Sequence, residues 1–302
     1  MKTATVAAAV AVVLAGQTPA LADGGVQADP PSWGLDRIDQ RTGLDHAYHF
    51  ATAAEGVSIY VIDSGVDANH PDFQGRVAPG RDFLNGGSDT SDTNGHGTRL
   101  AGLAAGKDYG VAKGAQIVPV RVLDKDGGGA TDQIIAGIDW VAQNARQPAV
   151  AVLGIGGVPN DRLDAAVKRL AAVVPIAVPA GSETADASGF SPGRVAEALT
   201  VGATDAQDHP DKASNFGQDV DLYAPGVDVP GPIAGGTGAG PESGTSMAAA
   251  FAAGVAALYL AQHPESTPAQ VDQALVQAAT TDALNGVPDG TANRLLYAPA
   301  GS

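Results

Sequence analysis

The chain has 302 residues, no cysteine and a formal net charge of −16, and hydrophobic residues make up 44% of it. This length and composition fit a globular protein with one large domain, and they exclude a disulfide framework, a thiolate nucleophile and a cysteine-ligated metal. The acidic balance, which also favours solubility, argues against nucleic acid or an anionic membrane as a partner. No uninterrupted apolar run reaches the roughly 20 residues that span a bilayer.

The N-terminus has the pattern of a secretory signal peptide. Lys2 supplies a positive charge, residues 4–14 form a short apolar core, and Ala20-Leu21-Ala22 is a small-residue cleavage pattern. Cleavage after Ala22 predicts a secreted, extracellular protein, and the loss of Lys2 with residues 1–22 leaves a net charge of −17. A short buried helix is the alternative interpretation of this segment.

The rest of the chain is predicted to form one domain. Residues 23–32 are polar and contain glycine and proline, which predicts a short flexible leader. No linker, repeat or low-complexity block interrupts residues 33–302. Nothing in the sequence indicates an oligomer, so we expect a monomer.

Short β-branched runs alternate with amphipathic segments along this domain. Strands are predicted over residues 57–62, 116–122, 149–153, 173–178 and 198–201, and helices over residues 132–144 and 161–172. This alternation is typical of an α/β fold with a parallel sheet and helices on both faces. Functional groups in such a sheet gather where the strands end at their carboxyl edge.

Three turns that contain glycine each carry a reactive side chain. Asp63 ends a predicted strand as Asp-Ser-Gly, His96 lies in Gly-His-Gly-Thr before a small apolar helix, and Ser246 lies in Gly-Thr-Ser-Met-Ala at the start of an apolar helix. A serine nucleophile, an imidazole base and a carboxylate that orients the imidazole are what acyl transfer requires. A helix start at Ser246 would also place backbone N–H groups near a developing oxyanion. Each motif alone is also typical of an ordinary turn or helix cap.

In the order Asp, His, Ser, these motifs resemble the signatures of the subtilisin-like serine peptidases, the subtilase family, and most of all its proteinase K and aqualysin branch. The resemblance covers nearly all of residues 33–297 and includes the stretches 33–39, 120–124, 135–140 and 221–226. It implies a subtilisin-like three-layer fold with a mostly parallel sheet of about seven strands. It also implies a secreted serine endopeptidase that acts on a protein or peptide substrate.

The resemblance also implies a set of backbone segments that bind an extended peptide by strand addition and line its pocket. These segments contain Gly127, Gly128, Gly129, Gly154, Ile155, Gly156, Ala180 and Gly181. For the glycine run at 127–129, a simple loop is the alternative interpretation.

The most consequential departure from the family pattern is Ser182, which stands where the oxyanion asparagine is expected. A hydroxyl is shorter than a carboxamide, so Ser182 is expected to be a weak substitute, and the Ser246 backbone N–H is the remaining donor. Loss of such a donor costs about 10²–10³ in turnover, a magnitude that belongs to subtilisin, which this chain resembles.

Other departures lie around the predicted site. Val152 and Gly154 stand where the family has polar residues in the pocket wall. Arg99 replaces a common histidine, and Ala250-Phe251 replace Pro-His. We expect the replacements at 99, 250 and 251 to be tolerated, because none of these positions is required to transfer a proton.

By residue-wise matching, a calcium site would use the Asp221 carboxylate and the carbonyl oxygens of Ala196 and Ala198, an all-oxygen set that suits this cation. A turn cap is the alternative role for Asp221. Family members are usually made with a pro-domain, and the ten residues between Ala22 and Trp33 are too few for one. We therefore expect one of three cases: the chain folds unaided, a separate molecule assists its folding, or the protein does not undergo autoprocessing.

Two functions from different classes follow from these observations. The first is a secreted serine endopeptidase with the triad Asp63, His96 and Ser246, slowed by Ser182. The second is a catalytically impaired pseudo-peptidase that binds peptide or protein without turnover, which the altered positions favour. A dinucleotide-binding loop at 154–157 is excluded because Val158-Pro159 stand where a third glycine should open a helix.

Overall fold

The computed structural model describes residues 24–299, so the predicted signal peptide at 1–22 lies outside the described residues. Its central layer is a sheet of nine strands, in which β12 alone runs antiparallel to its neighbour and all other neighbours are parallel. In spatial order the strands are β12 (Thr280–Thr281), β13 (Arg294–Leu295), β9 (Leu222–Pro225), β8 (Leu199–Thr204), β7 (Ile176–Pro179), β6 (Ala149–Leu153), β3 (Ser58–Asp63), β5 (Gln116–Arg121) and β4 (Arg81–Asp82). The predicted mostly parallel sheet is confirmed, with nine strands rather than about seven, because short strands of two residues extend both edges.

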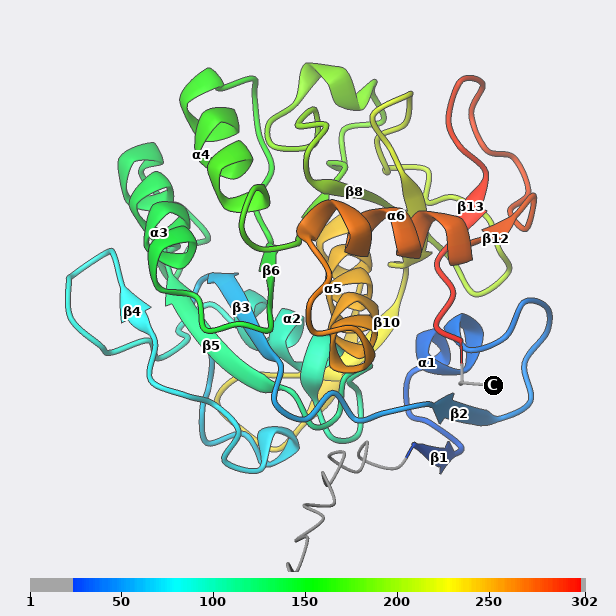
Figure 1. The fold of residues 1–302 in the computed structure, drawn as a ribbon, viewed down its shortest axis with the longest axis horizontal. Helices are drawn as coiled ribbons and strands as arrows, with labels where there is room; N and C mark the ends of the chain where they lie inside the picture. Colours follow the sequence, from blue (N-terminus) through cyan, green and yellow to red (C-terminus); the bar gives the residue numbers. More distant parts are fainter. Residues whose placement is uncertain (1–23, 300–302) are drawn as a thin grey trace, which may run out of the picture.

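Helices cover both faces of this sheet (Figure 1). Helices α2 (His96–Ala105) and α5 (Thr245–Gln262) pack on one face, and α3 (Thr131–Asn144) and α4 (Asp161–Ala171) pack on the other. The side chains of strand β3 explain why both faces are covered. Ile59 and Val61 pack in the apolar cluster with α2 and α5, whereas Tyr60 and Ile62 pack in the cluster with α3 and α4. Successive side chains of a strand point to opposite faces, so a fully apolar strand needs a helical layer on each side.

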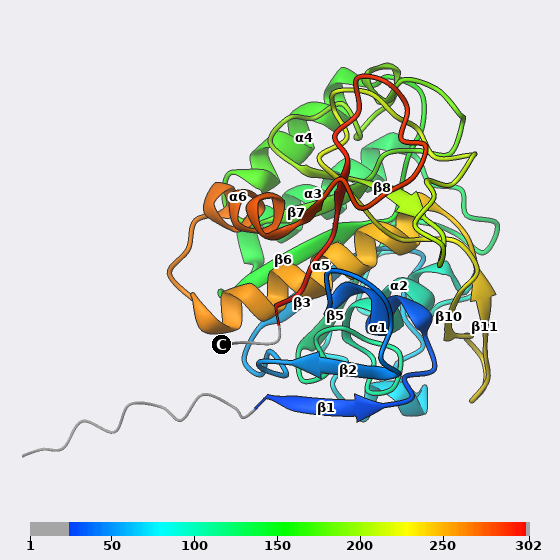
Figure 2. The same cartoon turned by 90° about the vertical axis from the view of Figure 1, so that its right-hand side faces the viewer.

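Helix α5 runs through the core beside the sheet (Figure 2). Within residues 24–299 it is the one helix long and apolar enough to cross a membrane, with a mean hydropathy of 1.3. Because 78% of it is buried inside the protein, these properties are those of a core helix.

The predicted strands and helices correspond to β3, β5, β6, β7, β8, α3 and α4, with shifts of up to three residues at their ends. Elements outside the prediction include the sheet strands β4, β9, β12 and β13 and the helices α1 (Trp33–Ile38) and α6 (Pro268–Ala278). They also include two small antiparallel sheets, β1 (Gly25–Ala28) with β2 (Ala47–Phe50) and β10 (Val229–Pro232) with β11 (Ala239–Glu242). The segment 23–32, predicted to be flexible, therefore contains a paired strand. Its partner lies about 20 residues away, and local composition does not reveal such pairing.

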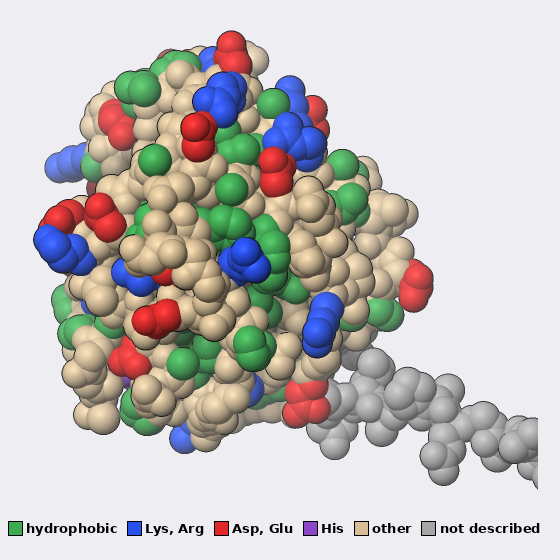
Figure 3. Space-filling model, turned by 90° about the vertical axis from the view of Figure 1, so that its left-hand side faces the viewer, with side chains coloured by type: hydrophobic (Ala, Val, Ile, Leu, Met, Phe, Trp, Pro, Cys, Tyr) green, Lys and Arg blue, Asp and Glu red, His purple; other side chains and the backbone are tan. Residues whose placement is uncertain are grey.

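The face formed by α3 and α4 carries acidic and basic side chains close together (Figure 3). Arg169 pairs with Asp139, and Arg162 pairs with Asp132, so two ion pairs join these helices. The negative net charge is therefore not gathered into one acidic patch on this face.

Candidate active site

Strand β3 brings Asp63 to the carboxyl edge of the sheet. All six residues of the strand are buried, and Asp63 has no exposed surface. A buried carboxylate requires partners, and the Ser64 backbone N–H donates to Asp63 Oδ1 at 2.7 Å.

His96 lies at the first position of α2 and faces this carboxylate. Its Nδ1 is 2.9 Å from both carboxylate oxygens of Asp63. The glycine after it permits this approach, because a Cβ at Gly97 would lie 2.2 Å from the Gly65 carbonyl oxygen. The contact fixes the ring through Nδ1 and leaves Nε2 for proton transfer.

The pKa of His96 is raised by its acidic neighbours. Burial lowers it, but the charge and hydrogen bond of Asp63, together with the charges of Glu242 and Asp92, outweigh burial and raise the pKa to about 9. Arg99, one turn further along α2, is the nearby cation and pairs with Glu242.

For the predicted peptidase activity, we therefore expect kcat/KM on an uncharged peptide to rise with pH and to reach half its maximum near pH 9. The reason is that only the neutral imidazole can accept a proton, and a raised pKa keeps His96 charged up to that pH. A pH–rate profile measures this value. A half-maximum near the ordinary histidine pKa of about 6.5 would contradict the strong coupling between His96 and its carboxylates.

A second carboxylate, Asp92, organises the segment that carries His96. Its oxygens accept five hydrogen bonds of 2.6 to 3.0 Å, from Ser64 Oγ, Asn94 N, Gly95 N, Thr98 N and Thr98 Oγ1. Ser64 Oγ in turn accepts from the Gly97 N–H at 3.0 Å. Asp92 thus ties the turn after β3 to the start of α2. This role of Asp92 was not predicted from the sequence, although an acidic residue just before a helix was the available signal.

Ser246 lies in the first turn of α5, and its Oγ donates to the Gly154 carbonyl oxygen at 3.5 Å. Gly154 also touches the other two groups, because a Cβ there would lie 2.2 Å from Asp63 Oδ2 and 2.9 Å from His96 Cε1. The structure therefore brings the three predicted side chains together around Gly154. Within residues 24–299, Ser246 Oγ makes no hydrogen bond to His96; such bonds are often long before substrate binds.

The predicted oxyanion groups lie beside Ser246. Ser182 Oγ is 3.5 Å from Thr245 Oγ1, which also accepts from the Gly181 N–H at 3.2 Å. The Ser246 N–H donates to no group among the described residues, as expected in the first turn of a helix. The turn at 181–185 is held by the fully buried Asn215, whose Oδ1 accepts from the backbone of Glu183 and Ala185.

The glycine run at 127–129 forms a turn closed by Asp124. The Asp124 N–H donates to the Gly128 carbonyl at 2.8 Å, and Asp124 Oδ1 accepts from the Gly128 N–H at 2.9 Å. Both polar groups of Gly128 are thus engaged. Within the described part of the chain, the Gly127 carbonyl and the Gly129 N–H have no hydrogen-bond partner, so these two groups are the ones that remain for a peptide.

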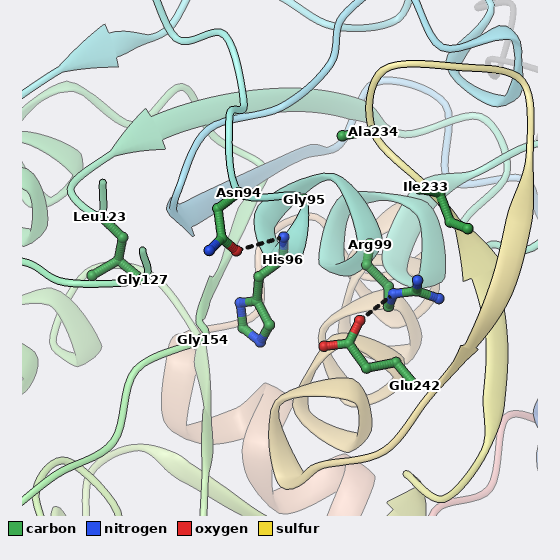
Figure 4. A pocket seen from close by; sticks show the side chains of 10 residues that line it. All are labelled: Asn94, Gly95, His96, Arg99, Leu123, Gly127, Gly154, Ile233, Ala234 and Glu242. Carbon is green, nitrogen blue, oxygen red and sulfur yellow. Dashed lines mark hydrogen bonds and ion pairs between the residues drawn. The ribbon is translucent and has the colours of Figure 1, made fainter. Parts of the chain in front are cut away.

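A cavity of about 380 Å³ opens at His96 (Figure 4). In this view His96 lies between two groups of lining residues. One group contains Asn94, Leu123, Gly127 and Gly154, and the other contains Arg99, Ile233, Ala234 and Glu242. In the second group, Arg99 belongs to α2, and the other three residues belong to the hairpin of β10 and β11, which was not predicted to be part of the site.

The predicted calcium ligands lie near the amino ends of two adjacent strands. Asp221 precedes β9, and its Oδ2 accepts from the Thr200 N–H of β8 at 2.8 Å, while Ala196 and Ala198 lie in the turn before β8. Burial raises the pKa of Asp221 to about 6, although the hydrogen bond from Thr200 and the charge of Arg294 act in the opposite direction. Arg294 donates to the backbone carbonyl oxygen of Asp221 at 3.4 Å. Residues 24–299 contain no cluster of three or more His, Asp or Glu side chains that could hold a metal. A buried carboxylate and backbone carbonyl oxygens are the two kinds of ligand that calcium accepts.

The chain is similar to known proteins over most of its length. Residues 54–294 match a protein family described as "Subtilase family". An extracellular serine proteinase from Thermus sp. (strain Rt41A) is 44% identical over 273 residues, covering 89% of this chain and 67% of the relative. Alkaline serine exoprotease A from Vibrio alginolyticus is 45% identical over 267 residues, and this chain spans only half of its length.

A solved structure shows the same fold. The crystal structure of a cold adapted subtilisin-like serine proteinase matches with a TM-score of 0.87 and 45% sequence identity. The match covers 89% of this chain and 98% of that one.

Proposed function

The chain belongs to the subtilase family and is by that membership a serine-type endopeptidase, and we propose that Asp63, His96 and Ser246 are its catalytic triad. The observation that supports this assignment is the 2.9 Å contact of Asp63 with His96 Nδ1, next to the Gly154 carbonyl that holds Ser246 Oγ.

In the proposed reaction, Ser246 Oγ attacks the scissile carbonyl carbon while its proton passes to His96 Nε2. Asp63 holds Nδ1–H and stabilises the imidazolium. The oxyanion of the tetrahedral intermediate accepts from the Ser246 N–H and, more weakly, from the Ser182 hydroxyl. As the C–N bond breaks, His96 gives the proton to the leaving amine, and a water molecule then hydrolyses the acyl-enzyme by the same steps.

The proposed substrate is an extended stretch of protein or peptide. Its acyl side would pair with the Gly127 carbonyl and the Gly129 N–H on one edge, and with the backbone of residues 154–156 on the other. Such contacts use backbone groups only, so the loss of polar side chains at Val152 and Gly154 leaves them in place. We also propose that the protein is secreted, since residues 1–22 have the pattern of a signal peptide and one relative is named extracellular.

A pseudo-peptidase is the second candidate function. It is favoured by Ser182 at the oxyanion position and by the contact of Ser246 Oγ with Gly154 rather than with His96. In this alternative the site would bind an extended peptide without turnover.

Labelling with a serine-directed fluorophosphonate separates the two candidates. An activated Ser246 is expected to be labelled in the mature protein and to lose the label in Ser246→Ala. Ser243→Ala is the matched control, because Ser243 lies three residues away, is exposed and contacts Asp228. No labelling of the folded wild type would support the pseudo-peptidase.

We further propose that calcium binds at Asp221 with the carbonyl oxygens of Ala196 and Ala198, and that it stabilises the fold. The folded pKa of Asp221, about 6, lies above its ordinary value of 3.8. Without metal, the free energy of unfolding therefore falls as pH rises through this window, because the carboxylate must ionise while buried. Calcium compensates this charge when bound.

The expected result is that calcium raises the Tm of the chelator-treated protein by about 5–10 °C at pH 8, assuming near-saturation of one site, and by much less at pH 4. Differential scanning calorimetry in a Ser246→Ala background avoids self-digestion. Asp221→Asn should abolish the response, whereas Asp126→Asn, an exposed control, should retain it. An equal calcium response in Asp221→Asn would contradict this site.

A further inference from the structure

An ion pair between Arg99 and Glu242 lies beside His96 and has no role in the proposed reaction. Arg99 Nε is 2.5 Å from Glu242 Oε2, and the guanidinium also donates to the carbonyl oxygens of Gly231 and Gly240. The Arg99 side chain is 9% exposed, whereas that of Glu242 is 38% exposed. The cation is therefore fixed in the wall, and its acidic partner faces the cavity at His96.

The position of Glu242 relative to the triad defines which part of a substrate would meet it. Gly127 and Gly154, which would hold the acyl side, lie on the other side of His96 from Glu242 (Figure 4). His96 must deliver its proton to the leaving amine, so the residues after the scissile bond have to pass His96 on the side away from the acyl strand. The hairpin of β10 and β11 lies on that side of His96.

The surroundings of Glu242 suit a long basic side chain. Ile233, which is 44% exposed, and Ala234 line the same part of the cavity and supply apolar surface for an aliphatic stem. Within residues 24–299, Arg99 is the only cation paired with Glu242, and no group donates a hydrogen bond to Oε1. Asp63, Asp92 and Glu242 place three carboxylates around one arginine and one histidine, so the local field favours an added cation.

The wall that carries these groups is held in place. The Ile233 N–H donates to Gly238 across the hairpin loop at 3.0 Å, and the Gly235 N–H donates to Asp67 Oδ2 at 2.9 Å. A fixed wall keeps the carboxylate and the apolar surface in one arrangement, which a specificity site needs.

We propose that Glu242, held by Arg99, makes the leaving-group side of the site selective for lysine or arginine in the first two residues after the scissile bond. This inference rests on the proposed peptidase function. It also gives a role to the Arg99 replacement, which the sequence alone left as a tolerated change.

The test uses three peptides that share one acyl sequence and carry Lys, Ala or Glu in the first two residues of the leaving group. For the full mature protein we expect kcat/KM to be roughly tenfold higher for the Lys peptide than for the Glu peptide at low salt, with the difference shrinking at high salt. Glu242→Gln has nearly the same shape and should reduce the ratio to about twofold or less. Glu265→Gln, a matched control just beyond the far end of α5, should retain the wild-type ratio.

Binding of the same peptides to the Ser246→Ala protein, followed by fluorescence anisotropy, provides a readout that does not depend on turnover. If the Ala peptide is not cleaved at all, the proposed peptidase function is overturned, while the ratio of binding constants still decides this inference. Equal affinities for the Lys and Glu peptides, or a preference that survives in Glu242→Gln, would overturn it.

Discussion

Replacing Ser246 with alanine is expected to abolish peptide hydrolysis, with a fall in kcat on the order of 10⁶-fold, the magnitude known for subtilisin, a member of this family. The variant lacks the only oxygen that forms the acyl-enzyme, and the remaining donors can only bind the substrate. Folding should be unaffected, since Ser246 Oγ makes a single long contact of 3.5 Å with Gly154.

The measurement is the initial rate on a chromogenic peptide, with Tm recorded for each variant. Ser243→Ala should retain wild-type activity. His96→Ala combined with Ser246→Ala should be no slower than Ser246→Ala alone, because members of a triad act as a unit. Wild-type activity in Ser246→Ala would show that another group is the nucleophile.

Replacing Ser182 with asparagine is expected to raise kcat by about 10²-fold with little change in KM. A carboxamide reaches further than a hydroxyl, and a donor to the oxyanion acts in the transition state rather than on the bound substrate. The structure offers room for the change: Ser182 is exposed, and its one contact is the 3.5 Å approach to Thr245 Oγ1. The turn itself is held by Asn215, which the substitution does not touch.

Steady-state kinetics of Ser182→Asn beside Ser188→Asn checks this expectation. Ser188 is an exposed serine in the same region and should have no effect on kcat. If asparagine at 182 brings no gain, then either the hydroxyl already serves as an adequate donor or another change limits the rate. Both outcomes would contradict Ser182 as the cause of slow turnover.

The fold and the positions of the three reactive side chains were predictable because each depends on local patterns. Asp63 follows a strand that is apolar on both faces, so its place at the carboxyl edge of a parallel sheet follows from the fold class. His96 and Ser246 lie in glycine-containing motifs next to apolar runs, which placed both side chains at helix starts.

Long-range partnerships were not predictable from these patterns. Arg99 and Glu242 are separated by 142 intervening residues, and each alone resembles an ordinary surface charge. The same holds for β1, whose pairing with β2 depends on a remote strand, and for the Asp124 turn, which engages Gly128 in contacts that a run of three glycines does not specify.

The missing side chain at Gly154 has a consequence for how this site could change over evolutionary time. The volume that a Cβ would need is occupied by the Asp63 carboxylate, the Leu100 side chain and the His96 ring, the nearest atom being only 2.2 Å away. Serine at 154 would therefore require shifts in its neighbours, whereas asparagine at 182 has room. The two departures from the family pattern thus differ in how easily one substitution could undo them, and local geometry sets that difference.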